Sequence, residues 1–160
     1  MEDECLESHQ MSKRSFQILV IPFFRNHDQN FQYCIFKRAD ESYWQAIAGG
    51  GGIEESPIQA ATREVVEETG ISHTAQYFQL ETISSIPAYY FQDLDCSHQK
   101  PYVIPNYCFA VKVPDCKITL SAEHSQYQWV NYQTAKRLLR WDDNKTALWE
   151  LNEKLLDGSL

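Results

Sequence analysis

The sequence GGGGIEESPIQAATREVVEETGI, residues 49–71, joins four consecutive glycines to a segment with helical character that carries three glutamates near its end. Ser56 and Gln59 have the types and spacing of a capping box, and a proline directly follows the serine, as is typical of a first helical position. Gly70 suits the left-handed residue that often ends a helix. These signals predict a helix over residues 57–69.

The three glutamates lie where a helix alone would not favour them. Glu64, Glu67 and Glu68 fall in the last two turns, where the partial negative charge of the helix end disfavours acids. Glu64 and Glu68 are also a like-charge pair four residues apart, which costs about 0.2–0.5 kcal/mol. A divalent metal with oxygen ligands would offset both penalties. Without the glycines, Glu55 and Arg63, the same acids would indicate only an exposed helix face.

One side of this helix is predicted to pack on a sheet, and the three glutamates are predicted to project from the opposite side. The packing side consists of residues at helical spacing: Ile58, Ala61, Thr62, Val65 and Thr69. Further patterns predict strands over residues 16–24, 31–36, 44–48, 77–87, 102–113 and 126–130. Two closing helices are expected over residues 132–140 and 144–156. Residues 88–91 are expected to extend a strand, and Pro105 indicates an edge strand or a bulge.

Composition and charge are those of a single-domain globular protein. The chain has 160 residues, of which 43% are hydrophobic and 22% are charged, and its formal net charge is −8. This acidity argues against binding of a nucleic acid polymer through a basic face. No run approaches the roughly 18 apolar residues of a membrane span, so we expect no membrane partner and a cytoplasmic location. We also expect a flexible tail over residues 1–12 and one domain over residues 13–160, as a monomer or a homodimer.

The spacing of residues 49–71 follows the pattern G-x5-E-x7-R-E-U-x-E-E-x-G-U, where U is a bulky apolar residue. This pattern resembles the Nudix box, so the chain is similar to the Nudix hydrolases. The resemblance implies an α/β fold, the Nudix α/β/α sandwich with a mixed sheet and the Nudix loop–helix–loop. It also implies a Mg²⁺-dependent pyrophosphohydrolase in which Mn²⁺ can substitute. The interspersed strands and helices independently favour a mixed sheet with helices on both faces.

The types and positions of the acids suggest how they would act. Glu64 and Glu68 are one turn apart and can chelate one hard cation, while Glu67 can reach a second ion or hold a metal-bound water. Arg63 lies four residues before Glu67 and would orient that carboxylate. The resemblance adds Glu123, in the segment SAEHSQYQWV, as a further metal ligand. The general base is left open between Glu67 and Glu123.

Other roles in the site come from the glycine-rich segment. Gly49 and Gly50 would let backbone groups approach substrate phosphates without interference from a Cβ, and Glu55 would support the loop. By resemblance, the carbonyl of Ala48 would be a metal ligand. Many relatives have a glycine where this chain has Glu54, so the path of the loop over residues 49–52 is left open.

Segments outside the box resemble the bacterial dATP pyrophosphohydrolases, which also act as dihydroneopterin triphosphate pyrophosphatases. The stretch YCIFKRADESYWQAIAGG, residues 33–50, has their basic strand end before a Trp-Gln strand, and Lys13 matches a lysine that would contact phosphate. Lys37 and Arg38 fit phosphate contacts and a solvated strand end equally well. The implied reaction converts a nucleoside or pterin triphosphate to its monophosphate and pyrophosphate.

Three alternatives stay open in the sequence. The substrate could be another diphosphate derivative, such as ADP-ribose or a nucleotide sugar. The chain could be a non-catalytic nucleotide-sensing module, although such a module would be free to lose box glutamates that this chain keeps. Tyr89, Tyr90 and Phe91 could stack on a base or pterin ring, or they could be ordinary core or surface aromatics.

Overall fold

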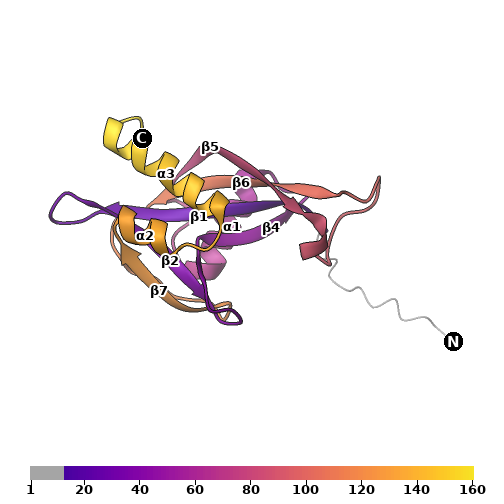
Figure 1. Cartoon of the computed structure of the whole chain (residues 1–160), viewed down its shortest axis with the longest axis horizontal. Helices are drawn as coiled ribbons and strands as arrows, with labels where there is room; N and C mark the ends of the chain where they lie inside the picture. Colours follow the sequence, from indigo (N-terminus) through magenta and orange to yellow (C-terminus); the bar gives the residue numbers. More distant parts are fainter. Residues whose placement is uncertain (1–12) are drawn as a thin grey trace.

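The computed structural model describes residues 13–160, in which a mixed sheet forms the central layer between helices (Figure 1). The expected tail over residues 1–12 lies outside the described residues. The strands are β1 (Arg14–Arg25), β2 (Phe31–Arg38), β3 (Trp44–Gln45), β4 (Ile47–Gly52), β5 (Gln76–Pro87), β6 (Val103–Lys112) and β7 (His124–Val130). The helices are α1 (Pro57–Thr69), α2 (Tyr132–Leu138), α3 (Asp142–Asp157) and the short 3₁₀ helix η1 (Ala88–Tyr90).

Strand β1 organises the sheet, whose main path is β3-β2-β1-β6-β5. It runs parallel to β6 and antiparallel to both β2 and β4, which follow each other along the same edge of β1. Its side chains alternate between two cores, as a sheet covered on both faces requires. Ile18 and Val20 pack with α1, whereas Leu19 and Ile21 pack with α2 and α3. The predicted α/β/α sandwich with a mixed sheet is therefore confirmed.

The helix that follows the glycines has the predicted bounds. Ser56 accepts a hydrogen bond from the backbone N–H of Gln59, the Gln59 side chain accepts one from the N–H of Ser56, and Gly70 ends the helix with φ 71°. Its predicted packing side is only partly right, because Ile58 is 42% exposed while Glu68 is only 3% exposed. The prediction that all three glutamates project away from the core is thus wrong for Glu68.

Three other predictions differ from the structure. The strand expected over residues 44–48 is divided at Ala46 into β3, which pairs with β2, and β4, which pairs with β1 along its length and extends through the glycines to Gly52. Residues 88–90 form η1 instead of extending β5. Strand β6 lies between β1 and β5 and is not an edge, but Pro105 pairs only with β5, because pairing with β1 begins at Asn106. The missing N–H of the proline therefore costs no bond to β1.

Helix α3 holds the irregular middle of β5. Between Gln79 and Ile83 the pairing of β5 with β6 is interrupted, and the buried carboxylate of Glu150 accepts hydrogen bonds from the backbone N–H groups of Glu81 (2.6 Å) and Thr82 (2.8 Å). Lys154 donates to the same carboxylate at 2.8 Å.

None of the helices between residues 13 and 160 combines the length and apolar character that a membrane crossing requires.

Glu150→Ala should lower the free energy of unfolding by about 2–4 kcal/mol. The change leaves two N–H groups of β5 without their acceptor and removes the nearer of the two carboxylates that contact the ammonium of Lys154. Urea unfolding followed by circular dichroism measures the loss. Glu153→Ala, at an exposed position on the same helix, is the matched control and should change stability by less than about 0.5 kcal/mol. Equal stability of the two variants would contradict this role of Glu150.

Candidate active site

The glycines of β4 make room for side chains that cross the strand. A Cβ on Gly49 would overlap the side chain of Glu64, and a Cβ on Gly50 would lie 2.6 Å from the guanidinium carbon of Arg14. None of the glycines at positions 49–52 has a positive φ. This segment therefore does not need the positive φ values that glycine allows. It needs the space that the missing side chains leave for Glu64 and Arg14.

Arg63 ties the glycine segment to helix α1. Its guanidinium donates to both carboxylate oxygens of Glu55 (2.9 and 3.0 Å), to the carbonyl of Gly50 (2.8 Å) and to Glu64 Oε1 (2.9 Å). The four-residue spacing predicted that Arg63 would orient Glu67, but this contact is longer, at 3.5 Å. Arg63 thus mainly fixes Glu64 and the loop, and Glu67 remains 56% exposed at the outer side of the helix.

Glu68 is held by residues that come from far along the chain. Its Oε2 accepts hydrogen bonds from the hydroxyl of Ser121 (2.6 Å) and from Nδ1 of His124 (3.0 Å). Burial lowers the pKa of His124 and so favours the neutral ring; because a carboxylate only accepts, this hydrogen bond requires the ring proton to be on Nδ1. The local sequence around α1 contains no sign of these partners.

Glu123 lies next to Glu68, so two carboxyl groups of different segments meet. Partial burial and the neighbouring Glu68 carboxyl raise the pKa of Glu123. Burial also raises the pKa of Glu64 to about 7, against the opposing effect of Arg63. Carboxyl groups that resist ionisation in this way would be relieved by a cation.

The donor set fits a hard divalent metal such as Mg²⁺, because it consists of carboxylate oxygens. Glu64, Glu68 and Glu123 are the residues that could hold it, and Glu67 could join from the exposed side. Among residues 13–160, no three acidic, histidine or cysteine side chains already stand in a closed coordination arrangement. The residues therefore supply the ligand chemistry, and their side chains would have to turn toward an ion.

The raised pKa of Glu64 predicts that the metal-free protein becomes less stable as pH rises. Between the unfolded value of 4.5 and the folded value of about 7, the folded state keeps a proton that the unfolded state has lost. The free energy of unfolding should therefore fall through this window by about 1–2 kcal/mol after allowance for solvent screening. Urea unfolding in EDTA at pH 5 and pH 8 measures it. Glu64→Gln should lack this part of the pH dependence, and an unchanged slope in the variant would refute the assignment.

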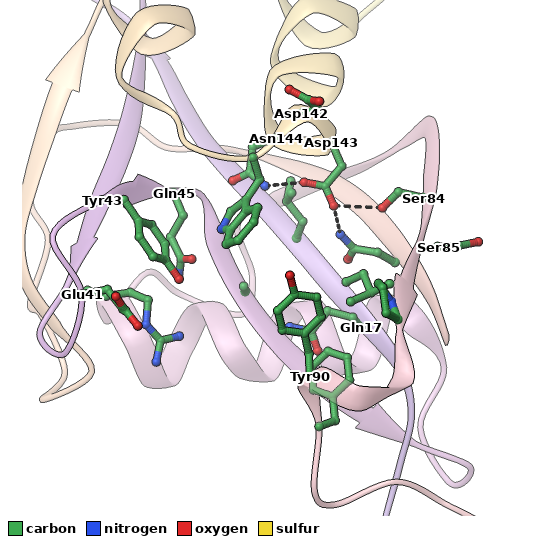
Figure 2. A pocket seen from close by; sticks show the side chains of 18 residues that line it. Gln17, Glu41, Tyr43, Gln45, Ser84, Ser85, Tyr90, Asp142, Asp143 and Asn144 are labelled. Carbon is green, nitrogen blue, oxygen red and sulfur yellow. Dashed lines mark hydrogen bonds between the residues drawn. The ribbon is translucent and has the colours of Figure 1, made fainter. Parts of the chain in front are cut away.

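A pocket of about 790 Å³ opens on the α3 side of the sheet (Figure 2). Figure 2 shows Tyr43 and Tyr90 at two sides of it, with Asp143 and Asn144 at the start of α3 above them. Ala48 lines this pocket, and the next residue, Gly49, touches Glu64. The pocket and the acidic cluster therefore meet across strand β4.

The structure brings one of the three predicted substrate-binding cations to this pocket. Arg38 lines it and is paired with Asp40 by two hydrogen bonds of 2.7 Å. Lys37 and Lys13 do not line the pocket. Lys37 lies on β2, where that strand pairs with β3 on one side and β7 on the other, and Lys13 is exposed before β1. Arg14, which the sequence did not single out, lies against Gly50.

Of the three aromatic residues at positions 89–91, two line the pocket and one does not. Tyr90 and Phe91 line the pocket, whereas the side chain of Tyr89 is 80% exposed. Trp141 also lines it and packs edge-to-face on Tyr43, with ring centroids 5.5 Å apart. A flat ring could therefore find aromatic faces here, which keeps open the stacking role considered for Tyr90 and Phe91.

Comparisons with known proteins agree with the observed fold. The family model described as the NUDIX domain matches residues 14–149. A solved structure described as a NUDIX hydrolase, from Listeria monocytogenes, is 43% identical and superposes with a TM-score of 0.80, covering 89% of this chain and 95% of that one.

Two curated relatives differ in how much of their length is matched. An octanoyltransferase from Myxococcus xanthus is 35% identical over 101 residues, which are 58% of this chain but only 24% of that protein. The chain thus spans about a quarter of that relative. A dihydroneopterin triphosphate diphosphatase from Escherichia coli is 28% identical over 142 residues, covering 85% of this chain and 91% of that protein.

Proposed function

The chain belongs to the NUDIX domain family of pyrophosphohydrolases, and we propose that it hydrolyses a nucleoside or pterin triphosphate to its monophosphate and pyrophosphate. The observation that carries the proposal is the meeting of the acidic cluster and the pocket at Ala48 and Gly49. A ring and sugar in the pocket would place a phosphate chain over this strand, beside Glu64. The E. coli diphosphatase, whose name states a pterin triphosphate substrate, supports this substrate class.

The proposed roles follow from the contacts of each side chain. Glu64, Glu68 and Glu123 would hold Mg²⁺, with the carbonyl of Ala48 as a further ligand. Bound there, the ion would screen phosphate charge and activate water. Ser121 and His124 hold the Glu68 carboxylate in place.

The remaining groups of the site would act on the substrate and the attacking water. Arg38 would face the phosphates from the pocket wall. Arg63, held by Glu55, binds the carbonyl of Gly50 and so fixes the strand that the phosphates would cross. Glu67 or Glu123 would accept the proton of the attacking water.

A panel of triphosphates assayed for product tests the proposal. With Mg²⁺ we expect release of one pyrophosphate per monophosphate formed, and no turnover in EDTA. An ADP-ribose or nucleotide-sugar hydrolase would instead turn over those diphosphates and release no pyrophosphate. Binding of nucleotides without any turnover in Mg²⁺ or Mn²⁺ would indicate a sensing module and would overturn the proposal.

A further inference from the structure

Asn106, on strand β6, holds a hydrogen-bond acceptor that nothing in residues 13–160 satisfies. The side chain is only 3% exposed, and its Oδ1 has no partner within the described chain. An unpaired buried oxygen of this kind is unfavourable, because it has lost its hydrogen bonds to water without gaining others. Asn106 also lines the pocket, so a bound ligand is the natural source of the missing donor.

The orientation of this amide is fixed by Asp143. The Asn106 Nδ2 donates to Asp143 Oδ2 at 2.9 Å, and a carboxylate can only accept. Asp143 is in turn held by the hydroxyl of Ser84 (2.9 Å) and by the Nδ2 of Asn144 (2.7 Å). Figure 2 shows these bonds converging on Asp143. Because the amide nitrogen must face Asp143, the oxygen must face the other way, and Asn106 cannot turn to offer a donor instead.

The surrounding wall favours the same kind of ligand. Glu41 and Asp142 line the pocket together with Asp143, and Arg38 is the one cation among the lining residues. Three carboxylates and one cation therefore line the pocket, and Asn106 Oδ1 adds a further acceptor, so a ligand that presents N–H groups suits this part of the wall better than one that presents only carbonyl oxygens. Tyr90, in the same wall, offers a ring face to a flat molecule.

We propose, on the basis of the triphosphatase function proposed above, that the pocket selects heterocycles carrying an exocyclic amino group, which donates to Asn106 Oδ1. Asp143 acts as the positioning residue that keeps this oxygen available. The oxygen is shielded from water by its neighbours. Binding of the amino group therefore includes displacement of a lining side chain.

Two matched substrate pairs test the selection, since each pair differs only by an amino group. The pairs are dATP with 2′-deoxy(purine riboside) triphosphate, and dGTP with dITP. For the wild-type protein with Mg²⁺, kcat/KM should be about tenfold to a hundredfold higher for the amino member of at least one pair. Hydrolysis of both members of both pairs within twofold of each other would overturn the inference and leave the triphosphatase function intact.

Variants link the selectivity to the proposed atoms. Asn106→Leu removes the acceptor and should bring the ratio close to one, mainly by slowing the amino substrate. Asp143→Asn frees the amide to turn and should lower the ratio as well. Tyr33→Phe is the control, because it removes a buried hydrogen bond to Asn152 (2.6 Å) outside the pocket, and it should keep the wild-type ratio. An unchanged ratio in a folded Asn106→Leu or Asp143→Asn protein would contradict the assignment.

Calorimetry separates this inference from the proposed reaction. The monophosphates of the same pairs are titrated into wild-type protein in EDTA, where no hydrolysis occurs. Tighter binding of the amino member, lost in Asn106→Leu, supports the inference even if no triphosphate is hydrolysed. Equal binding within each pair overturns it, whereas absence of Mg²⁺-dependent hydrolysis by itself counts only against the proposed function.

Discussion

Glu68→Gln should lower kcat for Mg²⁺-dependent triphosphate hydrolysis by about a hundredfold to a thousandfold. Glutamine keeps the shape of the side chain, and its Oε1 can still accept the hydrogen bonds from Ser121 and His124. The change therefore removes the negative charge from the buried end of the cluster with little effect on folding. Initial rates of pyrophosphate release at saturating substrate, at a series of Mg²⁺ concentrations, measure the effect.

Two further variants make this result specific. Glu54→Gln, at an exposed position in the loop before α1, should keep the wild-type rate. Glu67→Gln and Glu123→Gln distinguish the candidates for the general base, because only loss of the base should flatten the acidic limb of the pH–rate profile. Wild-type rates in both Glu67→Gln and Glu68→Gln would refute the assignment of the box glutamates.

The burial of Glu68 shows where prediction from sequence stops. The helix bounds depend on local signals, namely a capping box and a terminal glycine, and these were predicted correctly. The environment of Glu68 depends on Ser121 and His124, which lie 53 and 56 positions away. A buried carboxylate with distant donors looks identical, in sequence, to an exposed one.

The glycine segment illustrates a second limit. Glycine is depleted in strands, so the strand was expected to end before residue 49. Pairing with β1 overrides this weak preference, and the flat backbone lets Glu64 and Arg14 lie against it. Local propensity could not reveal this, because the benefit comes from side chains of other elements.

The pocket was the least predictable part of the molecule. Asn106 and Asp143 belong to no motif, and their hydrogen bond joins segments 37 residues apart. The box predicts chemistry because its acids share one helix, whereas the proposed ring pocket is lined by residues of β1, β5, β6 and α3, among others. Reaction class is therefore readable in this chain from residues 49–71, while substrate choice depends on long-range packing.

Gly49→Ala should reduce kcat/KM by about a hundredfold and leave the fold intact. The new Cβ would overlap the Cγ and carboxyl carbon of Glu64, and the carboxyl end is the flexible part of that side chain. The strand can therefore keep its place in the sheet, since position 49 has no positive φ, while the carboxylate is pushed out of the cluster. A displacement of about 1 Å at a reacting centre is enough for an effect of this size.

The comparison of activity with stability decides whether Gly49 has this role. Hydrolysis and Mg²⁺ affinity should both fall in Gly49→Ala, whereas the thermal midpoint in EDTA should stay within a few degrees of wild type. Ile53→Ala, in the same segment but with a side chain that is 69% exposed, should leave all three unchanged. Gly49 is the residue of β4 against which Glu64 lies. A Gly49→Ala protein that hydrolyses triphosphates at the wild-type rate would therefore show that Glu64 need not lie against this strand.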